Sequence, residues 1–300
     1  MWVSEQTDVK PSAHCVFTPC KPFCRVLLPP PTIECRTSML RNVKDLETYR
    51  IAATDGMIGA PKDFYFDDEA WVIRYLVVET DWGAVRRVLI SPISMEKRNW
   101  VDQRLTLSLT RQQIQDSPNI DTEKPVSRQQ EMGYLDYYGY GTYWGGGGLW
   151  GASLWPDSLQ AGMQSRTASQ EPEAQENDPH LRSANEVMRY YVHAIDGDIG
   201  HVEGMIINEE SWAIQYLVVN TSNWWLGHQV LIAPEWIDHV SWAESTVYLD
   251  LPRAAVKSSP PYDSAVPIGR DEEKGIHAHY GRKPYWPNET ATPATSKLRD

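Results

Sequence analysis

The chain has 300 residues and a formal net charge of −12, and its aromatic residues are mostly Tyr (15) and Trp (13) rather than Phe (4). This length suits two ordinary domains, and the acidic charge argues against binding to nucleic acid or to anionic lipid, because like charges repel. No run of about 18 or more apolar residues exists, which argues against a transmembrane segment, so we expect a soluble protein of the cytoplasm.

The first 38 residues differ from the rest of the chain. They hold all the cysteines and a run of prolines, Pro29–Pro31, and they show no hydrophobic periodicity. We interpret residues 1–38 as a disordered extension, and one hypothesis places the translation start at Met39 rather than Met1. The alternative is a small zinc site, although the cysteine spacing lacks the C-x2-C pairs typical of such sites. These cysteines are Cys15, Cys20, Cys24 and Cys35.

From residue 39 onward, short hydrophobic runs separated by turn residues predict a series of β-strands. Asp55–Gly56 marks a first turn, since glycine adopts positive φ at little cost. The polar residues Asp67–Glu69 predict a hairpin turn, and Trp71–Val78 is the strongest predicted strand. We expect this strand to be buried towards its C-terminal end and wet on one face at its start, where Arg74 lies.

Two further strands are predicted at 85–90 and 104–109, and Pro92 ends the first of them because proline cannot donate to a β-ladder. Thr110 suits the N-cap of a short helix over 110–114. A stretch rich in Tyr and Trp follows, and we call it the first aromatic arm. Its aromatic residues are Tyr134, Tyr137, Tyr138, Tyr140, Tyr143, Trp144 and Trp150.

The same order of features recurs later in the chain, which indicates an internal repeat. Leu40–Arg41 recurs as Leu181–Arg182, and the arms share matched Arg, Glu, Gly, Tyr and Trp positions. The second copy holds the Asp-Gly turn at 196–197, the polar hairpin at 208–210, the long strand at 212–219 and the proline-ended strand at 229–234. The predicted organisation is a repeat at 39–150, a flexible linker at 151–180, a second repeat at 181–287 and a disordered tail at 288–300.

Several of these runs carry a family resemblance. They are Asp55-Gly56-x-Ile58-Gly59, Ile73-x-Tyr75-Leu76-Val77-Val78 and Val88-Leu89-Ile90-Ser91-Pro92, each with a counterpart in the second copy. In this order they resemble the PRC-barrel domain, which occurs in the cytoplasmic part of the photosynthetic reaction centre H subunit. The resemblance implies a small β-barrel used for interactions, and it supplies no catalytic residue. The expected fold is therefore all-β, with two tandem PRC-like barrels related by pseudo-two-fold symmetry, short helices and aromatic arms.

The repeat also serves as an internal control on chemistry, because the first copy contains no His and no Cys. A zinc site, a His-based acid–base pair or a Cys nucleophile is therefore not expected in both copies, and we expect no catalytic residue, metal or cofactor. Asp55 and Asp196 are better explained as turn residues than as catalytic carboxylates. The polar hairpins fit solvated turns better than calcium sites. His277 and His279 would share a face of a strand, yet solvated histidines explain them better than a metal site.

The leading functional interpretation is a non-enzymatic interaction or scaffold protein with an unidentified protein partner. We expect each arm to pack across the other barrel, giving an intramolecular pseudo-dimer; the alternative leaves the arms for an external partner. Other readings are a small-ligand sensor with a pocket between the barrels, a peripheral component of a membrane protein complex, and an enzyme that uses residues private to the second copy. The candidate interface residues are Trp71, Tyr75, Trp212, Tyr216, Tyr138, Tyr143, Trp144, Tyr280, Tyr285 and Trp286.

Overall fold

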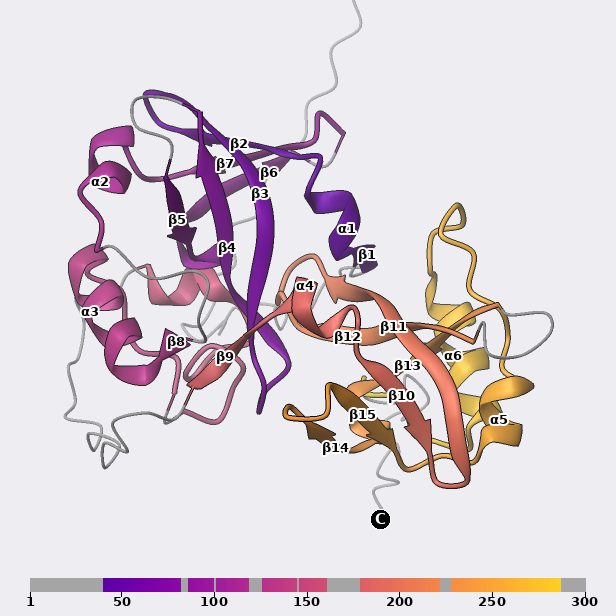
Figure 1. Cartoon of the computed structure of the whole chain (residues 1–300). Helices are drawn as coiled ribbons and strands as arrows, with labels where there is room; N and C mark the ends of the chain where they lie inside the picture. The colour runs from indigo at the N-terminus through magenta and orange to yellow at the C-terminus, as the bar shows by residue number, and fades with distance from the viewer. Residues whose placement is uncertain are drawn as a thin grey trace, which may run out of the picture. The chain divides into compact units, whose positions relative to one another are not determined.

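The computed structural model describes residues 40–81, 86–99, 101–118, 126–144, 146–160, 179–221 and 228–286. These residues form two curled β-sheets with few helices (Figure 1), which confirms a mostly β structure. We call residues 40–160 module 1 and residues 179–286 module 2. The predicted extension with its cysteines, Met39, most of the predicted linker and the predicted tail lie outside the described residues.

The sheet of module 1 has the strand order β5-β4-β3-β2-β7-β6. Neighbouring strands are antiparallel except β2 and β7, which run parallel. The strands are β2 (Arg50–Ala53), β3 (Gly56–Asp67), β4 (Val72–Thr80), β5 (Arg87–Ile90), β6 (Met95–Asn99) and β7 (Arg104–Leu107). The short β8 (Val126–Ser127) pairs with β9 (Pro179–Ser183). The helices are α1 (Val43–Leu46), η1 (Pro92–Ser94), α2 (Arg111–Gln115), α3 (Arg128–Tyr138) and η2 (Pro156–Leu159).

The sheet of module 2 repeats this order strand for strand as β13-β12-β11-β10-β15-β14. Closure of either sheet into a barrel and a pseudo-two-fold axis between the modules stay predictions. The strands are β10 (Tyr191–Ala194), β11 (Gly197–Asn208), β12 (Ile214–Asn220), β13 (Gln229–Ile232), β14 (Ile237–Ser241) and β15 (Thr246–Leu249). The helices are α4 (Ala184–Val187), η3 (Pro234–Trp236), α5 (Arg253–Lys257) and α6 (Arg270–His279).

Each module lends its first strand to the sheet of the other. Strand β1 (Leu40–Asn42) pairs with β11 of module 2, with Arg41 opposite Ile207. Strand β9 (Pro179–Ser183) pairs with β3 of module 1, with Arg182 opposite Phe66. The recurrence of Leu-Arg at positions 40–41 and 181–182 therefore marks two strands that the modules exchange.

Aspartates in the Asp-Gly turns hold the short helices in place. Asp55 Oδ1 accepts a hydrogen bond from the backbone N–H of Arg111 at 2.8 Å, and Asp196 Oδ1 accepts one from Arg253 at 2.7 Å. Each carboxylate thus satisfies an orphan amide at the start of α2 or α5, which agrees with a turn role for both residues. The predicted N-cap is confirmed, because Thr110 Oγ1 accepts from the N–H of Gln113.

A second glycine in each copy permits a close approach of backbones. A Cβ at Gly59 would lie 2.0 Å from the carbonyl oxygen of Glu79, and one at Gly200 would lie 1.8 Å from that of Asn220. No real side chain fits at such distances, so only glycine lets β3 and β11 pack against their neighbours here. This requirement explains why the glycine recurs in both repeats.

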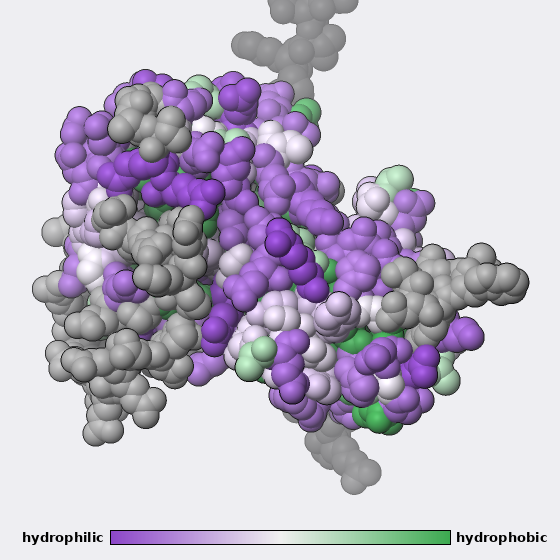
Figure 2. All heavy atoms as spheres, in the orientation of Figure 1, coloured by the Kyte–Doolittle hydropathy of each residue, from purple (hydrophilic) through white to green (hydrophobic). Residues whose placement is uncertain are grey.

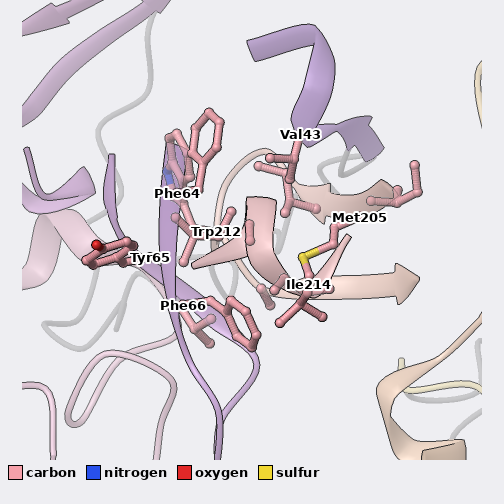
Figure 3. Packing of buried hydrophobic residues seen from close by; sticks show 14 of the residues in the cluster. Val43, Phe64, Tyr65, Phe66, Met205, Trp212 and Ile214 are labelled. Carbon is pink, nitrogen blue, oxygen red and sulfur yellow. The ribbon is translucent and has the colours of Figure 1, made fainter. Parts of the chain in front are cut away.

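The buried apolar side chains of the two modules form one contiguous cluster. Figure 3 shows Phe64 and Phe66 of β3 beside Trp212 and Ile214 of module 2, with Val43 of α1 near Met205. Outside this core, the face drawn in Figure 2 is dominated by hydrophilic side chains, and its apolar atoms lie in small separate patches. The two modules therefore share one hydrophobic core and do not each have a separate one.

The aromatic arms begin with helices that the sequence reading missed, and these helices pack on their own module. Tyr134 of α3 donates its hydroxyl hydrogen to the carbonyl of Leu89 in β5 at 2.8 Å, and α6 contacts β12 through side chains described below. The prediction that each arm crosses to the other barrel is therefore wrong for α3 and α6. Trp150 does reach the sheet of the other module, since its Nε1 donates to the carbonyl of Ser211 at 2.7 Å. Glu131 and Tyr143 contact His180 of the exchanged strand β9.

Candidate functional site

The exchanged strands bring arginines to the hairpin turns of the opposite module. Arg41 of β1 donates through Nε to Glu209 Oε1 at 2.7 Å, and Arg182 of β9 donates through Nε to Asp68 Oδ2 at 2.9 Å. Burial raises the pKa of the Asp68 carboxyl, and the bond from Arg182 opposes that rise. Two of the acidic residues in the predicted turns are thus ion-pair partners across the boundary between the modules.

The polar residues at the tips of these hairpins make turns, as predicted. The prediction that the turns are solvated is wrong for Asp67, Asn208 and Glu209, which are buried. Asp67 Oδ1 accepts from the backbone N–H groups of Glu69 and Ala70, each at 3.1 Å. In the matching turn of module 2, Asn208 Oδ1 accepts hydrogen bonds from the backbone N–H groups of Glu210 at 2.9 Å and Ser211 at 3.0 Å. A side chain that caps its own turn in this way explains why Asp and Asn occur at this position.

Tryptophans after both turns adopt a strained backbone and join the modules. Trp71 has φ of 53° and Trp212 has φ of 60°, a region that bulky residues rarely occupy. In this conformation the carbonyl of Trp71 accepts from the N–H of Ile214 at 2.7 Å, and the carbonyl of Trp212 accepts from that of Ile73 at 2.9 Å. The strain is therefore held by a reciprocal pair of hydrogen bonds between the modules.

A buried carboxylate organises the aromatic arm of module 1. Glu131 of α3 is fully buried, and its Oε1 accepts from the Tyr75 hydroxyl at 2.9 Å while its Oε2 accepts from the Tyr143 hydroxyl at 2.9 Å. His180 Nε2 lies 2.9 Å from the same Oε2, and Arg128 Nη1 lies 3.9 Å from it. Because His180 belongs to β9, the strand that module 2 lends to the sheet of module 1, a residue of module 2 completes this cluster.

Module 2 contains a closely similar cluster. Glu273 of α6 is 3% exposed, and its Oε1 accepts from the hydroxyls of Tyr216 at 3.1 Å and Tyr285 at 2.8 Å. Its Oε2 accepts from Arg270 Nη1 at 2.8 Å. His277 Nε2 lies 3.1 Å from the Tyr216 hydroxyl. The strand tyrosine, helix glutamate, arm tyrosine and helix arginine thus occupy matched positions in the two repeats.

The histidines of the two clusters come from different elements. The sequence predicted no histidine common to both modules, because the first copy contains none, but a histidine lies in each cluster. His277 lies in α6, whereas His180 lies in β9, outside the segment compared as the first repeat. Comparison of the repeats alone therefore missed that each module encloses one histidine beside a carboxylate–tyrosine cluster. One sequence feature could have indicated the role of His180. It directly precedes Leu181–Arg182, the repeated pair that marks the exchanged strand.

Burial sets the protonation behaviour of these groups. It raises the pKa of the Tyr75 and Tyr216 hydroxyls well above the ordinary value, and the adjacent glutamate charge raises it further. Burial also raises the pKa of Glu273, against the lowering effect of its hydrogen bonds and of Arg270. It lowers the pKa of His277. The tyrosines therefore remain protonated hydrogen-bond donors that hold each arm helix on its long strand.

Arg74 is buried, so the prediction of a wet face at the start of the long strand is wrong. The residue is 2% exposed, its Nη2 lies 3.3 Å from Asp67 Oδ2, and its Nη1 donates to the carbonyl of Leu149 at 2.6 Å. Its guanidinium carbon lies 3.6 Å from the centre of the Tyr143 ring and 4.7 Å from that of Trp150. The arm aromatics thus cover the arginine and enclose its charge.

The two arm histidines that the sequence placed on a strand belong to a helix instead. His277 is 2% exposed, while His279 is exposed and its Nε2 lies 2.8 Å from the carbonyl of Ala255. Residues two apart on a helix point in different directions. The two imidazoles therefore do not share a face, and the prediction that both histidines are solvated is wrong for His277.

The sequence-predicted interface residues are inside the molecule or half-buried. Five are buried: Tyr75, Tyr143, Trp212, Tyr216 and Tyr280. Five are half-buried: Trp71, Tyr138, Trp144, Tyr285 and Trp286. The clusters and the module boundary bring most of them together, so their contacts are largely within the chain.

Apolar side chains that the sequence reading did not single out project from the end of the first arm. Leu154 is 52% exposed and Trp155 is 48% exposed. The preceding loop is held by bridges between Gly148 and Gly151 and between Trp150 and Ser153. Since Trp150 is itself anchored on module 2, the loop presents the two exposed side chains on a fixed base.

The described residues also contain an open depression of about 480 Å³ in module 2, lined in part by Glu186, Arg189 and Tyr190. Within these residues, no group of three or more His, Cys, Asp and Glu side chains is arranged to hold a metal ion. None of the described helices is both long and apolar enough to cross a membrane.

Comparison with models of known protein families gives no match for this chain, and neither does comparison with curated proteins.

Proposed function

We propose that the chain is a non-enzymatic interaction protein whose two PRC-like barrels, related by a pseudo-two-fold axis, act together as one platform for a partner protein. Three observations support this proposal. The two sheets have the same strand order, the modules exchange strands reciprocally, and the carboxylate–tyrosine clusters occupy matched positions.

The observation that carries the proposal is the closure of both clusters. Glutamate, histidine and tyrosine are side chains capable of acid–base catalysis, yet Glu131 and Glu273 are 0% and 3% exposed and each accepts hydrogen bonds from two tyrosines. A catalytic group must reach its substrate, and these groups are sealed beneath their own arms. Their contacts stabilise the fold and favour a structural over a catalytic role.

The exposed pair Leu154 and Trp155 is the best candidate contact for the partner. Tryptophan is enriched among the residues that dominate binding energy at interfaces. The base beneath the pair is ordered, since the N–H of Trp155 donates to Ser153 Oγ at 3.1 Å and Ser158 Oγ donates to the carbonyl of Trp155 at 2.8 Å. Binding through a prearranged loop avoids much of the entropy cost of ordering.

A small-ligand sensor is the second candidate, and the open depression beside α4 favours it. Arg189, Glu186 and Tyr190 give this depression charged and aromatic walls. The pocket foreseen between the barrels is less well supported, because Trp212 is fully buried and cannot line an open site. A thermal-shift screen separates the two candidates, since a ligand that binds the folded state raises its melting temperature.

The interaction proposal is tested by cross-linking the full chain in its native host and identifying the attached proteins by mass spectrometry. The variant Leu154→Ser/Trp155→Ser is compared with the wild type. We expect the yield of a specific cross-linked partner to fall about tenfold or more, as for loss of a dominant interface residue.

The matched control is Tyr191→Ser, which removes another exposed aromatic residue, 66% exposed, from module 2. It should leave the partner yield unchanged. A wild-type chain that cross-links to no specific partner would contradict the proposed function. An equal yield from the double variant would exclude Leu154 and Trp155 as the contact.

A further inference from the structure

Two arginines stand side by side on the outer face of the module 1 sheet. Strands β2 and β7 are parallel neighbours, and Arg50 lies directly opposite Arg104. Both residues are exposed, whereas the adjacent pair Ile51 and Leu105 is fully buried on the other face. Since neighbouring strands lie about 4.8 Å apart, the two arginine side chains begin next to each other on this face.

Within the part of the chain that the structure describes, no carboxylate forms an ion pair or hydrogen bond with either arginine. Across the sheet, Glu79 of β4 lies opposite Ala60 of β3 and Arg87 of β5. The turn before Arg104 holds one carboxylate, that of Asp102. Like charges placed directly opposite each other in a sheet are destabilising. The pair therefore carries a local energetic cost in a chain whose net charge is −12.

Module 2 shows that the fold does not need arginine at these positions. The corresponding strands, β10 and β15, are also parallel, and Tyr191 lies opposite Thr246 in the matching register. The strand order around them is the same in both modules. The arginine pair is thus a feature of module 1 alone, and its cost is not explained by the architecture.

We propose that Arg50 and Arg104 form a binding site for a phosphomonoester group carried by a segment of the partner protein, an inference that rests on the proposed function. A guanidinium matches the geometry of phosphate oxygens, and two of them balance the charge of nearly −2 that such a group carries near neutral pH. An anionic membrane presents the same chemistry, but its extended negative surface is repelled by the acidic chain as a whole.

The test follows backbone amide resonances of β2 and β7 in the full chain during titration with a neutral peptide that bears one phosphoserine. Inorganic phosphate and vesicles of phosphatidylcholine with phosphatidic acid are titrated in parallel, and the unphosphorylated peptide serves as a blank. The test variant is Arg50→Tyr/Arg104→Thr, which installs the side chains that module 2 has in this register. The control is Lys274→Ala, which removes one exposed cation of module 2.

We expect saturable shifts in β2 and β7 with the phosphopeptide and with phosphate, weakened about tenfold or more in the double variant and unchanged in the control. Absence of saturable shifts, or equal affinity in the double variant, would overturn the site. Arginine-dependent binding to the vesicles but not to the phosphopeptide would overturn the protein-borne source. The two proposals can fail separately. If the double variant still cross-links to the partner of the wild type, and phosphate shifts no resonance of β2 or β7 in the wild type, then the phosphate site is excluded and the proposed function is not.

Discussion

At the scale of single residues, the long strand of each module carries one tyrosine whose hydroxyl meets a buried glutamate. The sequence made Tyr75 and Tyr216 conspicuous, because both stay unchanged while neighbouring positions vary. It did not reveal their partners, since Glu131 lies 56 residues from Tyr75 and hydrogen bonds at such separations leave no local pattern. The buried state of Arg74 was equally hidden, because a charged residue on a strand suggests solvent unless its covering residues are known.

Arg74 gives a sharp residue-scale prediction, because module 2 has Gln215 at the matching position. Replacing Arg74 by Gln leaves Asp67, itself 3% exposed, without its cationic partner. We expect the free energy of unfolding to fall by about 3 kcal/mol, since an uncompensated buried charge is costly. Urea unfolding measures this change. Gln215→Ala is the comparison and should cost less than about 1 kcal/mol; equal effects at the two sites would contradict the assignment.

His277 gives a prediction about pH. Burial lowers its pKa below the ordinary value of 6.5, so the folded state resists a proton that the unfolded state accepts. The stabilising contribution is complete above that ordinary value and is lost as the pH falls towards the folded-state pKa. The raised pKa of Glu273 changes the unfolding free energy with pH in the opposite direction. Because the wild type and the His277→Gln variant both contain Glu273, its effect cancels when the two proteins are compared.

We therefore expect the unfolding free energy of the wild type to decline more steeply than that of His277→Gln between about pH 7.5 and pH 5. Urea unfolding across this range provides the measurement. Parallel pH curves for the two proteins would show that His277 is not shielded from protons in the folded state.

At the scale of elements, alternation and turn residues predicted the longer β-strands but did not single out β2, β6, β10 or β14. The Asp-Gly turns, the hairpin turns and the short helices followed from local chemistry. The helices α3 and α6 were missed because each is interrupted by a glycine and carries few aliphatic residues, so no clear helical stripe stands out. The exchanged strands β1 and β9 span three and five residues. Such short segments gain their structure from the partner sheet and show little periodicity of their own.

Glycine substitutions separate the demands of strand and helix. Gly200→Ala places a Cβ 1.8 Å from a backbone carbonyl oxygen, whereas a Cβ at Gly275 in α6 meets nothing within 4 Å. We expect Gly200→Ala to lower the unfolding free energy by about 3 kcal/mol or more, and Gly275→Ala to raise it by about 0.5–1 kcal/mol through better helix propensity. Thermal unfolding monitored by circular dichroism tests both. A neutral Gly200→Ala would mean that the strands can separate at this point.

At the scale of the whole molecule, the modules are joined by backbone pairing, side-chain ion pairs and a shared apolar core. Strands β1 and β9 are exchanged, Trp71 and Trp212 trade backbone hydrogen bonds with the opposite module, and Arg41 and Arg182 reach across to hairpin carboxylates. The internal repeat predicted two similar units. It did not predict exchange, because sequence similarity says which elements recur and not which copy each one joins.

The two modules are expected to unfold as one cooperative body, and amide hydrogen exchange in the folded protein measures whether they do. The N–H groups of Ile73 and Ile214 donate across the boundary between the modules, whereas those of Leu76 and Leu217 belong to residues in the middle of the two long strands. We expect all four amides to exchange only through global unfolding, with equal free energies of opening. Much faster exchange at Ile73 and Ile214 than at Leu76 and Leu217 would show that the modules open independently and do not form one cooperative body.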